Sequence, residues 1–223
     1  MDIEKVIKSI DYTLLKPIAT TEAITTFCDE AISYGFQTVF VNPYYVKYAS
    51  DYLSKHAIKV GAPIGFSLGG MKTGIKVAET QEAIKDGAQE IDMLINLGAM
   101  KSKDYPVVKR DISEVVKASE GLTTKVIIET GLLTEQEKRI ASELIVEAGA
   151  DFVKTATGFN GGGATVRDVE IIRGVVGPEF GIKAAGGIRS LADVEALMSA
   201  GASRIGTSSA IAIITGGQTN SAY

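Results

Sequence analysis

The sequence predicts an α/β protein of the (β/α)8 barrel class, the TIM barrel, in one domain over residues 1–223. Two observations support this prediction. Short apolar segments of strand character recur along the chain, and each is followed by an amphipathic segment of helical spacing. The eight repeats begin 21 to 35 residues apart, which matches the repeat length of a barrel of about 250 residues.

Each expected strand opens one repeat. The strands are short, mostly apolar and bounded by turn residues, as is typical of strands buried on both faces of a parallel sheet. In chain order they are IDYTLL from Ile10, TVFVNP from Thr38, KVGAPIG from Lys59, EIDMLIN from Glu90, KVIIET from Lys125, FVKTAT from Phe152, GIKAAG from Gly181 and RIGTSS from Arg204.

The expected helices lie between these strands. Over residues 135–148, apolar side chains recur on one helical face. Thr21, Thr134 and Ser190 are expected N-caps, because their hydroxyls can accept hydrogen bonds from free backbone N–H groups. No linker divides the chain, and the polar, Gly-rich end from about residue 216 is expected to be flexible.

A doubly wound open sheet also alternates strands and helices, and it is the structural alternative. The first strand–helix junction lacks the GxGxxG pattern of the dinucleotide-binding form of that fold, and eight nearly equal repeats favour closure. The glycine-rich GFNGGG segment at residues 158–163 follows a strand and precedes a helix, so it is interpreted as a βα loop.

Composition excludes several classes of partner. The net charge is −4, with 45% hydrophobic and 22% charged residues, and no basic run could follow a nucleic-acid backbone. The apolar stretches are shorter than a membrane span, and MDIEKVIKSI lacks the apolar core of a signal peptide. We therefore expect a cytoplasmic protein with no nucleic-acid or membrane partner.

The chain has one cysteine and one histidine. Cys28 falls on the apolar stripe of an expected helix, and His56 follows a helix in a polar loop. A zinc site made of several histidines is excluded, and nothing near His56 indicates a serine-hydrolase triad. The chemistry must therefore depend on Lys, Asp, Glu, Ser, Thr or Tyr side chains.

Alternation along the strands sorts side chains between the helices and the barrel interior. In EIDMLIN, Ile91, Met93 and Ile95 share the face expected to pack on helices, which turns Asp92 inward. The same alternation directs Lys154 and Lys183 inward, whereas Glu129 shares a face with Ile127 and its direction stays open. Asp92, Lys154 and Lys183 are thus expected to converge from three strands.

Two buried ammonium groups beside one carboxylate indicate a perturbed amine. Burial and a neighbouring cation both lower the pKa of a lysine, which otherwise lies near ~10.4 and keeps the amine protonated. A neutral amine can form a Schiff base, and Asp92 could move the protons. The alternative is a structural ion-pair cluster. A catalytic role is favoured over it by the count of two cations against one clear carboxylate and by the space beside Gly181 and Ala185.

A second group of candidate site residues, glycines and serines, follows the last two strands. Gly186 and Gly187 come after strand 7, and Gly206, Ser208 and Ser209 lie at strand 8 and the helix after it. Barrel enzymes frequently bind phosphate at these two loops, where glycines expose N–H groups and serines add donors. Ordinary turn glycines and an N-cap serine are the alternative.

The chain resembles the deoxyribose-phosphate aldolase family from residue 10 to about residue 215. The segments that carry the resemblance are, in order, IDYTLLKP, FVNP, IGFSLGG, EIDMLINLGA, KVIIET, DFVKTATGFNGGGAT, GIKAAGGIR and RIGTSSA. The resemblance implies a class I aldolase that needs no cofactor and no metal. It would reversibly cleave 2-deoxy-D-ribose 5-phosphate to acetaldehyde and D-glyceraldehyde 3-phosphate. Its partners would be a small phosphorylated sugar and short aldehydes, and a homodimer is common for such barrels.

The resemblance also implies residue roles, which alternation alone left open between the two lysines. Lys154 would form the Schiff base, Lys183 would be the neighbouring charge that makes it nucleophilic, and Asp92 would donate and accept protons. Asp11 and Thr157 would line the substrate site, and the C-terminal Tyr223 would transfer a proton at the enamine carbon. The phosphate would be held by Gly186, Gly187, Ser208 and Ser209.

Several positions depart from the family pattern. Tyr12 replaces a histidine, Ala156 and Ala185 replace serines, Ser67 replaces a proline, and Phe40 stands where many members have cysteine. None of these changes removes a proposed catalytic group. A lysine aldolase for another phosphorylated sugar and a non-catalytic sugar-phosphate-binding barrel remain alternatives, whereas the single histidine disfavours a metal-dependent aldolase.

Overall fold

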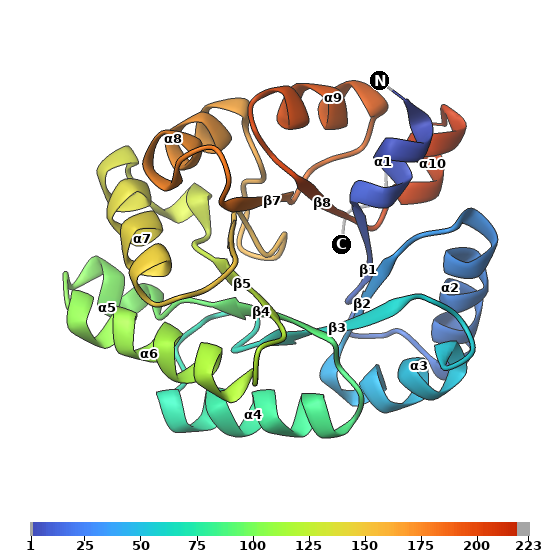
Figure 1. Ribbon diagram of the computed structural model, residues 1–223, viewed down its shortest axis with the longest axis horizontal. Coiled ribbons are helices and arrows are strands. Elements are labelled where there is room, and N and C mark those ends of the chain that lie inside the picture. Colours follow the sequence, from blue (N-terminus) through green and yellow to red (C-terminus); the bar gives the residue numbers. More distant parts are fainter. Residues whose placement is uncertain (1, 218–223) are drawn as a thin grey trace.

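The computed structural model describes residues 2–217, and within them eight parallel strands close into a barrel (Figure 1). Each strand pairs with the next in sequence, and β1 pairs with β8 to close the ring. The predicted (β/α)8 fold is confirmed. The strands are β1 Ile10–Leu14, β2 Thr38–Val41, β3 Lys59–Ile64, β4 Glu90–Leu94, β5 Thr123–Ile127, β6 Phe152–Lys154, β7 Gly181–Ala185 and β8 Arg204–Thr207.

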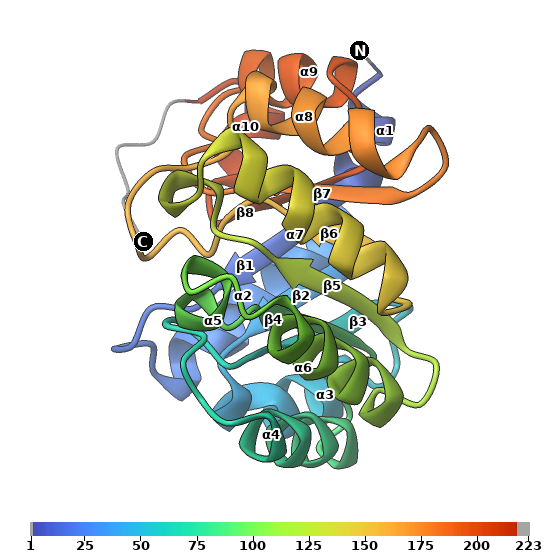
Figure 2. The ribbon, with the colours of Figure 1, turned by 90° about the vertical axis from the view of Figure 1, so that its left-hand side faces the viewer.

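Helices surround the strands as an outer layer, which Figure 1 shows along the barrel and Figure 2 from the side. They are α1 Ile3–Ser9, α2 Thr21–Tyr34, α3 Val46–Leu53, α4 Thr73–Lys85, α5 Leu97–Lys101, α6 Tyr105–Ala118, α7 Glu135–Glu147, α8 Val166–Val176, α9 Leu191–Ser199 and α10 Ala210–Thr215, with 3-10 turns η1 Pro43–Tyr45 and η2 Thr130–Leu132. Between residues 2 and 217 no helix is both long and apolar enough to cross a membrane.

The helix N-caps follow the predictions with one exception. Thr134 and Ser190 each form a capping box, in which the hydroxyl and an acidic side chain in the first turn satisfy each other's backbone N–H groups. Thr20, and not Thr21, caps α2: its backbone is extended and its hydroxyl accepts from Ala23 N. The prediction of Thr21 was wrong by one residue because Thr21 already belongs to the first turn.

The apolar core lies between the strands and the helices. Ile91, Met93 and Ile95 pack there, as predicted, and Cys28 is buried with them on α2. His56 is exposed after α3, also as predicted. The opposite face of each strand points into the barrel, where many side chains are charged.

Candidate active site

Asp92 is the centre of the charged barrel interior. Its Oδ2 accepts hydrogen bonds from Lys154 Nζ at 2.7 Å and Lys183 Nζ at 2.6 Å, and its Oδ1 accepts one from Lys125 Nζ at 3.1 Å. The parallel register pairs Lys154 directly with Lys183 on β6 and β7. The structure therefore brings together the three residues that alternation had directed inward, and it adds Lys125.

A second group of charged side chains extends the network from Asp92 to Asp11, Glu90 and Arg204. Lys125 Nζ lies 2.5 Å from Glu90 Oε2, and Lys183 Nζ lies 2.5 Å from Asp11 Oδ2. Arg204 donates to both Asp11 and Glu90. Between residues 2 and 217 this network joins three carboxylates, Asp11, Glu90 and Asp92, to the cations Lys125, Lys154, Lys183 and Arg204 and to the half-exposed Lys59, whose Nζ lies 3.6 Å from Glu90 Oε1.

The count of two cations against one clear carboxylate was therefore wrong. Lys125 and Arg204 open their expected strands, where an exposed end is the ordinary expectation for a charge, so neither was predicted to point inward. In the structure β5 begins at Thr123, and Lys125 lies within it. The sequence did contain a signal for Lys125. Side chains alternate along a strand, so Lys125 lies on the same face as Glu129, four residues later, and two charged residues on one face of a buried strand indicate the barrel interior. Cations remain in excess, since the three carboxylates contact five cations among the described residues.

Burial and neighbouring charges compete in setting the pKa values of this network. Burial acts to raise the pKa of Asp92, but the ammonium groups of Lys125, Lys154 and Lys183 hold it well below its ordinary range. Burial lowers the pKa of Lys183 to about 8, even though Asp11 and Asp92 act in the opposite direction. Asp92 is thus a carboxylate at neutral pH, and Lys183 is a cation that gives up its proton unusually easily.

Phe40 fills the interior beside the amines. Its ring centroid lies 3.8 Å from Lys183 Nζ, 4.6 Å from Lys125 Nζ and 5.9 Å from Lys154 Nζ, which are distances for cation–π contact. The ring occupies the space beside Gly61 on the neighbouring strand, where an added Cβ would lie 2.3 Å from it. Phe40 is almost fully buried and places an apolar, electron-rich face against the ammonium groups.

Two glycines near Lys183, Gly206 of the predicted phosphate site and Gly181 with its predicted ligand space, have protein side chains as neighbours. An added Cβ at Gly206 would lie 2.9 Å from Lys183 Cε, so this position makes room for the lysine itself. An added Cβ at Gly181 would lie 2.4 Å from the ring of Phe152, which fills that space. The prediction of ligand space beside Gly181 was therefore wrong.

The two inward lysines differ in access. The side chain of Lys154 is 7% exposed and that of Lys183 is 1% exposed. A hollow of about 320 Å3 lies at the carboxyl ends of the strands and is lined by apolar side chains that include Phe66 and Phe159. The Phe66 ring centroid is 5.8 Å from Lys154 Nζ, so one of the rings that line this hollow lies near Lys154.

The structure places the remaining predicted residues around the same end of the barrel. Gly186 and Gly187 both have positive φ angles, 91° and 75°, in the turn after β7. Ser208 and Ser209 follow β8, and Ser209 is buried. Thr157 donates its hydroxyl to Glu129, whereas Asp11 lies deeper, in contact with Lys183.

Of the departures from the family pattern, Phe40 lies within the amine cluster, 3.8 Å from Lys183 Nζ. Tyr12 belongs to the apolar core and donates its hydroxyl to Glu30 on α2, so the missing histidine side chain would have faced the helices. Ala156 and Ala185 are buried next to the turn after β7 and to Gly206. Tyr223 lies outside the described residues.

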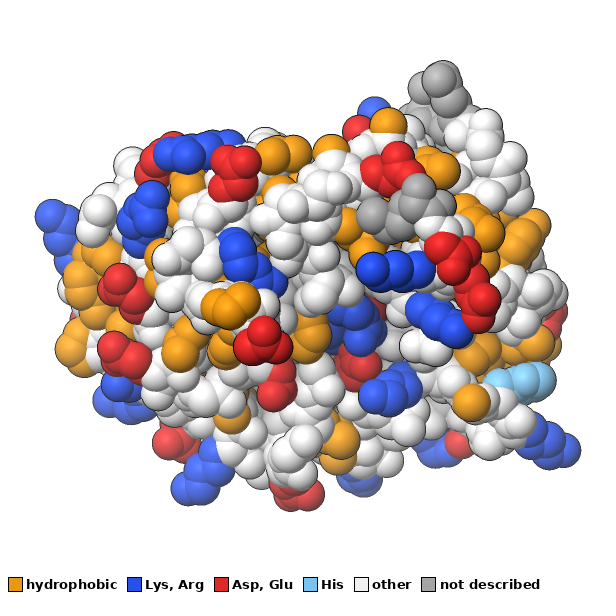
Figure 3. Space-filling view, turned by 45° about the horizontal axis from the view of Figure 1, so that its top comes forward, with side chains coloured by type: hydrophobic (Ala, Val, Ile, Leu, Met, Phe, Trp, Pro, Cys, Tyr) orange, Lys and Arg blue, Asp and Glu red, His pale blue; other side chains and the backbone are white. Residues whose placement is uncertain are grey.

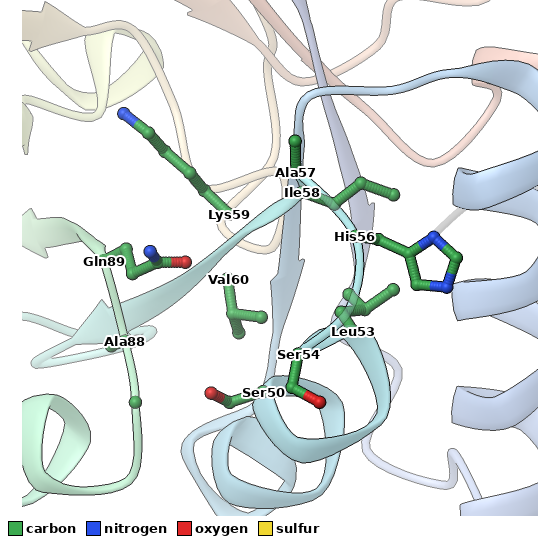
Figure 4. A pocket seen from close by; sticks show the side chains of 11 residues that line it. Ser50, Leu53, Ser54, His56, Ala57, Ile58, Lys59, Val60, Ala88 and Gln89 are labelled. Carbon is green, nitrogen blue, oxygen red and sulfur yellow. The ribbon is translucent and has the colours of Figure 1, made fainter.

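A larger hollow of about 600 Å3 lies at the opposite end of the barrel. It is bordered by the first residues of β3 and β4, and Figure 4 shows Lys59 and Gln89 on one side of it and His56 on the other. Of its lining residues Lys59 pairs with a carboxylate, Glu90, at 3.6 Å, but no second lysine in the lining shares that carboxylate in the way that Lys154 and Lys183 share Asp92. On the outer surface, acidic and basic side chains are interspersed (Figure 3). The reactive groups are therefore at the Phe66 end of the barrel.

The chain is similar to known aldolases over its whole length. It is 54% identical to deoxyribose-phosphate aldolase 2 of Oceanobacillus iheyensis, over 100% of both chains. It is 58% identical to the deoxyribose-phosphate aldolase of Thermococcus gammatolerans, over 97% of this chain and 96% of the relative.

Solved structures agree with these relatives. A tetrameric deoxyribose phosphate aldolase from Aeropyrum pernix matches with a TM-score of 0.90 at 34% identity, over 96% of this chain and 91% of the other. An aldolase named QR15 matches with a TM-score of 0.91 at 42% identity, over 97% and 96%. The model of the DeoC/LacD family aldolases matches residues 5–215. The chain, with its paired lysines in a closed barrel, therefore belongs to the DeoC/LacD aldolase family.

Proposed function

We propose that the chain is a deoxyribose-phosphate aldolase of class I. It reversibly cleaves 2-deoxy-D-ribose 5-phosphate to acetaldehyde and D-glyceraldehyde 3-phosphate through a Schiff base on Lys154. The observation that carries this proposal is the sharing of Asp92 Oδ2 by two ammonium groups, at 2.7 and 2.6 Å. The names of the full-length relatives support the choice of substrate.

Lys154 is the better nucleophile of the two lysines because its side chain is 7% exposed, against 1% for Lys183, and lies near the Phe66 ring. Lys183 is enclosed by the Phe40 ring, by Asp11 and by the backbone at Gly206. Lys154 is therefore proposed as the amine that meets the substrate, and Lys183 as the neighbouring cation that shares Asp92 Oδ2 with it.

The reaction then follows from the positions of Lys154 and Asp92. The neutral amine attacks the C1 aldehyde of the open-chain sugar, and loss of water gives an iminium ion. The C2–C3 bond breaks as the C3 hydroxyl gives up its proton, which releases glyceraldehyde 3-phosphate and leaves a two-carbon enamine on Lys154. Protonation of the enamine carbon and addition of water release acetaldehyde. Asp92 and Lys183, joined at 2.6 Å, relay the protons.

The phosphate is held by the turn after β7 and the segment after β8. The backbone N–H groups of the positive-φ turn at Gly186 and Gly187, with the hydroxyls of Ser208 and Ser209, supply neutral donors for it. Asp11 acts through Lys183, and Tyr223 is retained as a proton donor at the enamine carbon.

We also propose a homodimer that acts in the cytoplasm, where phosphorylated sugars are metabolised. Exposed tyrosines on two adjacent helices support self-association: Tyr48 stacks on Tyr52 of α3, and Tyr34 of α2 is 38% exposed. Light scattering of the purified protein gives its mass in solution, and a monomer at micromolar concentration contradicts the dimer.

Reductive trapping tests the proposed function. The protein is incubated with acetaldehyde and borohydride, and its peptides are analysed by mass spectrometry. We expect a stable ethyl adduct on Lys154, and cleavage of deoxyribose 5-phosphate in preference to other sugar phosphates. Absence of an adduct on every lysine would support a non-catalytic barrel, and preferred cleavage of a different sugar phosphate would reassign the substrate.

A further inference from the structure

The GFNGGG segment after β6 contains a side chain that bridges two other loops. Asn160 Nδ2 donates a hydrogen bond to the backbone carbonyl of Ser67 at 2.7 Å and another to Glu129 Oε2 at 2.8 Å. Ser67 lies in the loop between β3 and α4, and Glu129 lies at the end of β5. One amide group thus connects three βα loops at the end of the barrel where Lys154 lies.

Glu129 is the anchor of this bridge. It is fully buried and has a φ of 55°, a left-handed conformation that is uncommon for a residue with a side chain. Besides Asn160, its carboxylate accepts hydrogen bonds from Thr157 N at 3.0 Å and Thr157 Oγ1 at 2.5 Å. A buried carboxylate requires such donors, so Glu129 and the segment after Lys154 hold each other in place.

The same segment is in backbone contact with its neighbours on both flanks. An added Cβ at Gly162 would lie 3.3 Å from Gly131 Cα, and one at Gly163 would lie 2.5 Å from Gly186 O. Ala164 N also donates to Gly186 O at 3.0 Å. The position of the segment is therefore transmitted to the turn that carries Gly186.

The residue before Asn160 reaches the apolar side of the site. The ring of Phe159 meets that of Phe66 edge to face, with centroids 5.7 Å apart, and both line the hollow beside Lys154. Because Asn160 holds the backbone of Ser67, it fixes the two loops that carry these rings.

We propose that Asn160 is a positioning residue for the aldol reaction. Its two hydrogen bonds hold Phe159 against Phe66 as an apolar wall beside the Lys154 iminium and hold the Gly186 turn in register for the phosphate. The wall keeps water from the enamine, so that carbon–carbon bond chemistry proceeds on the bound intermediate. This inference rests on the proposed function and deepens it.

Substitutions at Asn160 test the inference. Asn160→Ala removes both donors, and we expect kcat/KM for deoxyribose 5-phosphate to fall by about tenfold to a hundredfold. Asn160→Asp keeps the size but turns a carboxylate toward Glu129 and Ser67 O, so its loss should be larger. Trapping of the acetaldehyde adduct on Lys154 should persist in both variants, because the amine and Asp92 are untouched.

A swapped pair separates positioning from general loosening of the loop. In the double variant Glu129→Gln with Asn160→Asp, the glutamine amide can donate to the new carboxylate, and we expect at least tenfold recovery over Asn160→Asp alone. Thr165→Ala is the matched control: it removes the N-cap of α8 on the same connection without touching Ser67 or Glu129. It should lower the Tm and leave kcat/KM unchanged.

Three results would overturn the positioning role of Asn160, and a fourth would reject the proposed function instead. If both Asn160 variants stay within twofold of the wild-type kcat/KM, or if the swapped pair shows no recovery, the positioning role is overturned. A loss of activity in Thr165→Ala as large as that in Asn160→Ala would also overturn it, because any disturbance of the loop would then suffice. Failure of the wild-type protein itself to form the Lys154 adduct is a different result, which rejects the proposed function.

Discussion

Lys76 lies in the helix layer, where its ammonium group contacts Asp111 Oδ2 at 2.5 Å and Leu94 O at 2.7 Å, whereas Lys154 lies in the barrel and contacts Asp92. Lys76 is 0% exposed, Asp111 has one lysine partner, and Thr73 donates to its second oxygen. Lys154 shares one carboxylate oxygen with Lys183 and lies 5.8 Å from the ring of Phe66, which lines a hollow.

The difference shows that burial alone does not make a lysine reactive. Lys76 is buried and its pKa is lowered by that burial, yet its surroundings are closed and it connects α4, α6 and the end of β4. Lys154 has two further properties: a second cation at its acceptor oxygen, and a side chain that is 7% exposed near Phe66, whose ring lines the hollow. These two properties distinguish a candidate nucleophile from a structural ion pair.

The largest expected effect separates the two lysines by activity. Lys154→Met should lower kcat by at least roughly a thousandfold and abolish the borohydride-trapped adduct, since the covalent nucleophile is gone. Lys76→Met should still form the adduct on Lys154 at a temperature where it is folded. Steady-state kinetics and peptide mass spectrometry of both variants make the comparison, and an adduct that moves to Lys183 in Lys154→Met would contradict the assigned roles.

Stability should show the reverse order. Lys76→Met leaves Asp111 as a buried carboxylate without its cation, which is expected to reduce the free energy of unfolding by about 3–5 kcal/mol. Adding Asp111→Leu should recover most of that loss, because it removes the unpaired charge. Urea unfolding followed by circular dichroism measures both variants. Equal stability of the single and double variants would show that the pair is not the source of the effect.

The pH dependence of stability sharpens the comparison at Lys183. Its pKa in the folded protein is about 8, below the ordinary value of 10.5. Between these values the unfolded chain binds a proton that the folded protein does not, so the residue makes the free energy of unfolding increase with pH, by on the order of 3 kcal/mol. Lys183→Met should lack this contribution, which urea titrations from pH 7.5 to 10 would detect as a smaller slope than in the wild type.

The smallest expected effect is on inactivation by aldehydes, and it concerns the Phe40 ring beside the lysines. Phe40 provides no thiol, so we expect the wild-type protein to keep its activity after exposure to crotonaldehyde. Phe40→Cys should gain time-dependent inactivation and an added crotonaldehyde mass on that residue, because a thiol near the amines can be alkylated. Rapid, irreversible inactivation of the wild type would show that a thiol at position 40 is not required.

Strand order and inward direction could be predicted from the sequence because both follow local rules. Repeat length indicated a closed barrel, and alternation placed Asp92, Lys154 and Lys183 on its inner face. The choice of Lys154 over Lys183 came from the family resemblance and not from spacing. In the structure it is supported by access to the hollow, which depends on loops from other repeats.

The residues that were missed depend on contacts between distant segments. Arg204 reaches Glu90 across 114 positions of sequence, and no local pattern indicates where a long side chain at a strand start will turn. The direction of the Glu129 side chain could not be predicted because the same face of its strand carries the apolar Ile127. Both side chains point into the barrel, while Val126 and Ile128 pack in the core. The role of Asn160 depends on a backbone carbonyl of another loop, which sequence alone does not specify.

The fit of Phe40 against Gly61 has a practical consequence for anyone who redesigns this barrel. Since a Cβ at position 61 would lie 2.3 Å from the ring, the two positions behave as one design variable shared by neighbouring strands. A library that varies position 61 alone would recover almost only glycine and would make the interior look intolerant of change. Varying both positions together, with a smaller side chain at 40, would open new volume beside the amines and give access to bulkier donor aldehydes.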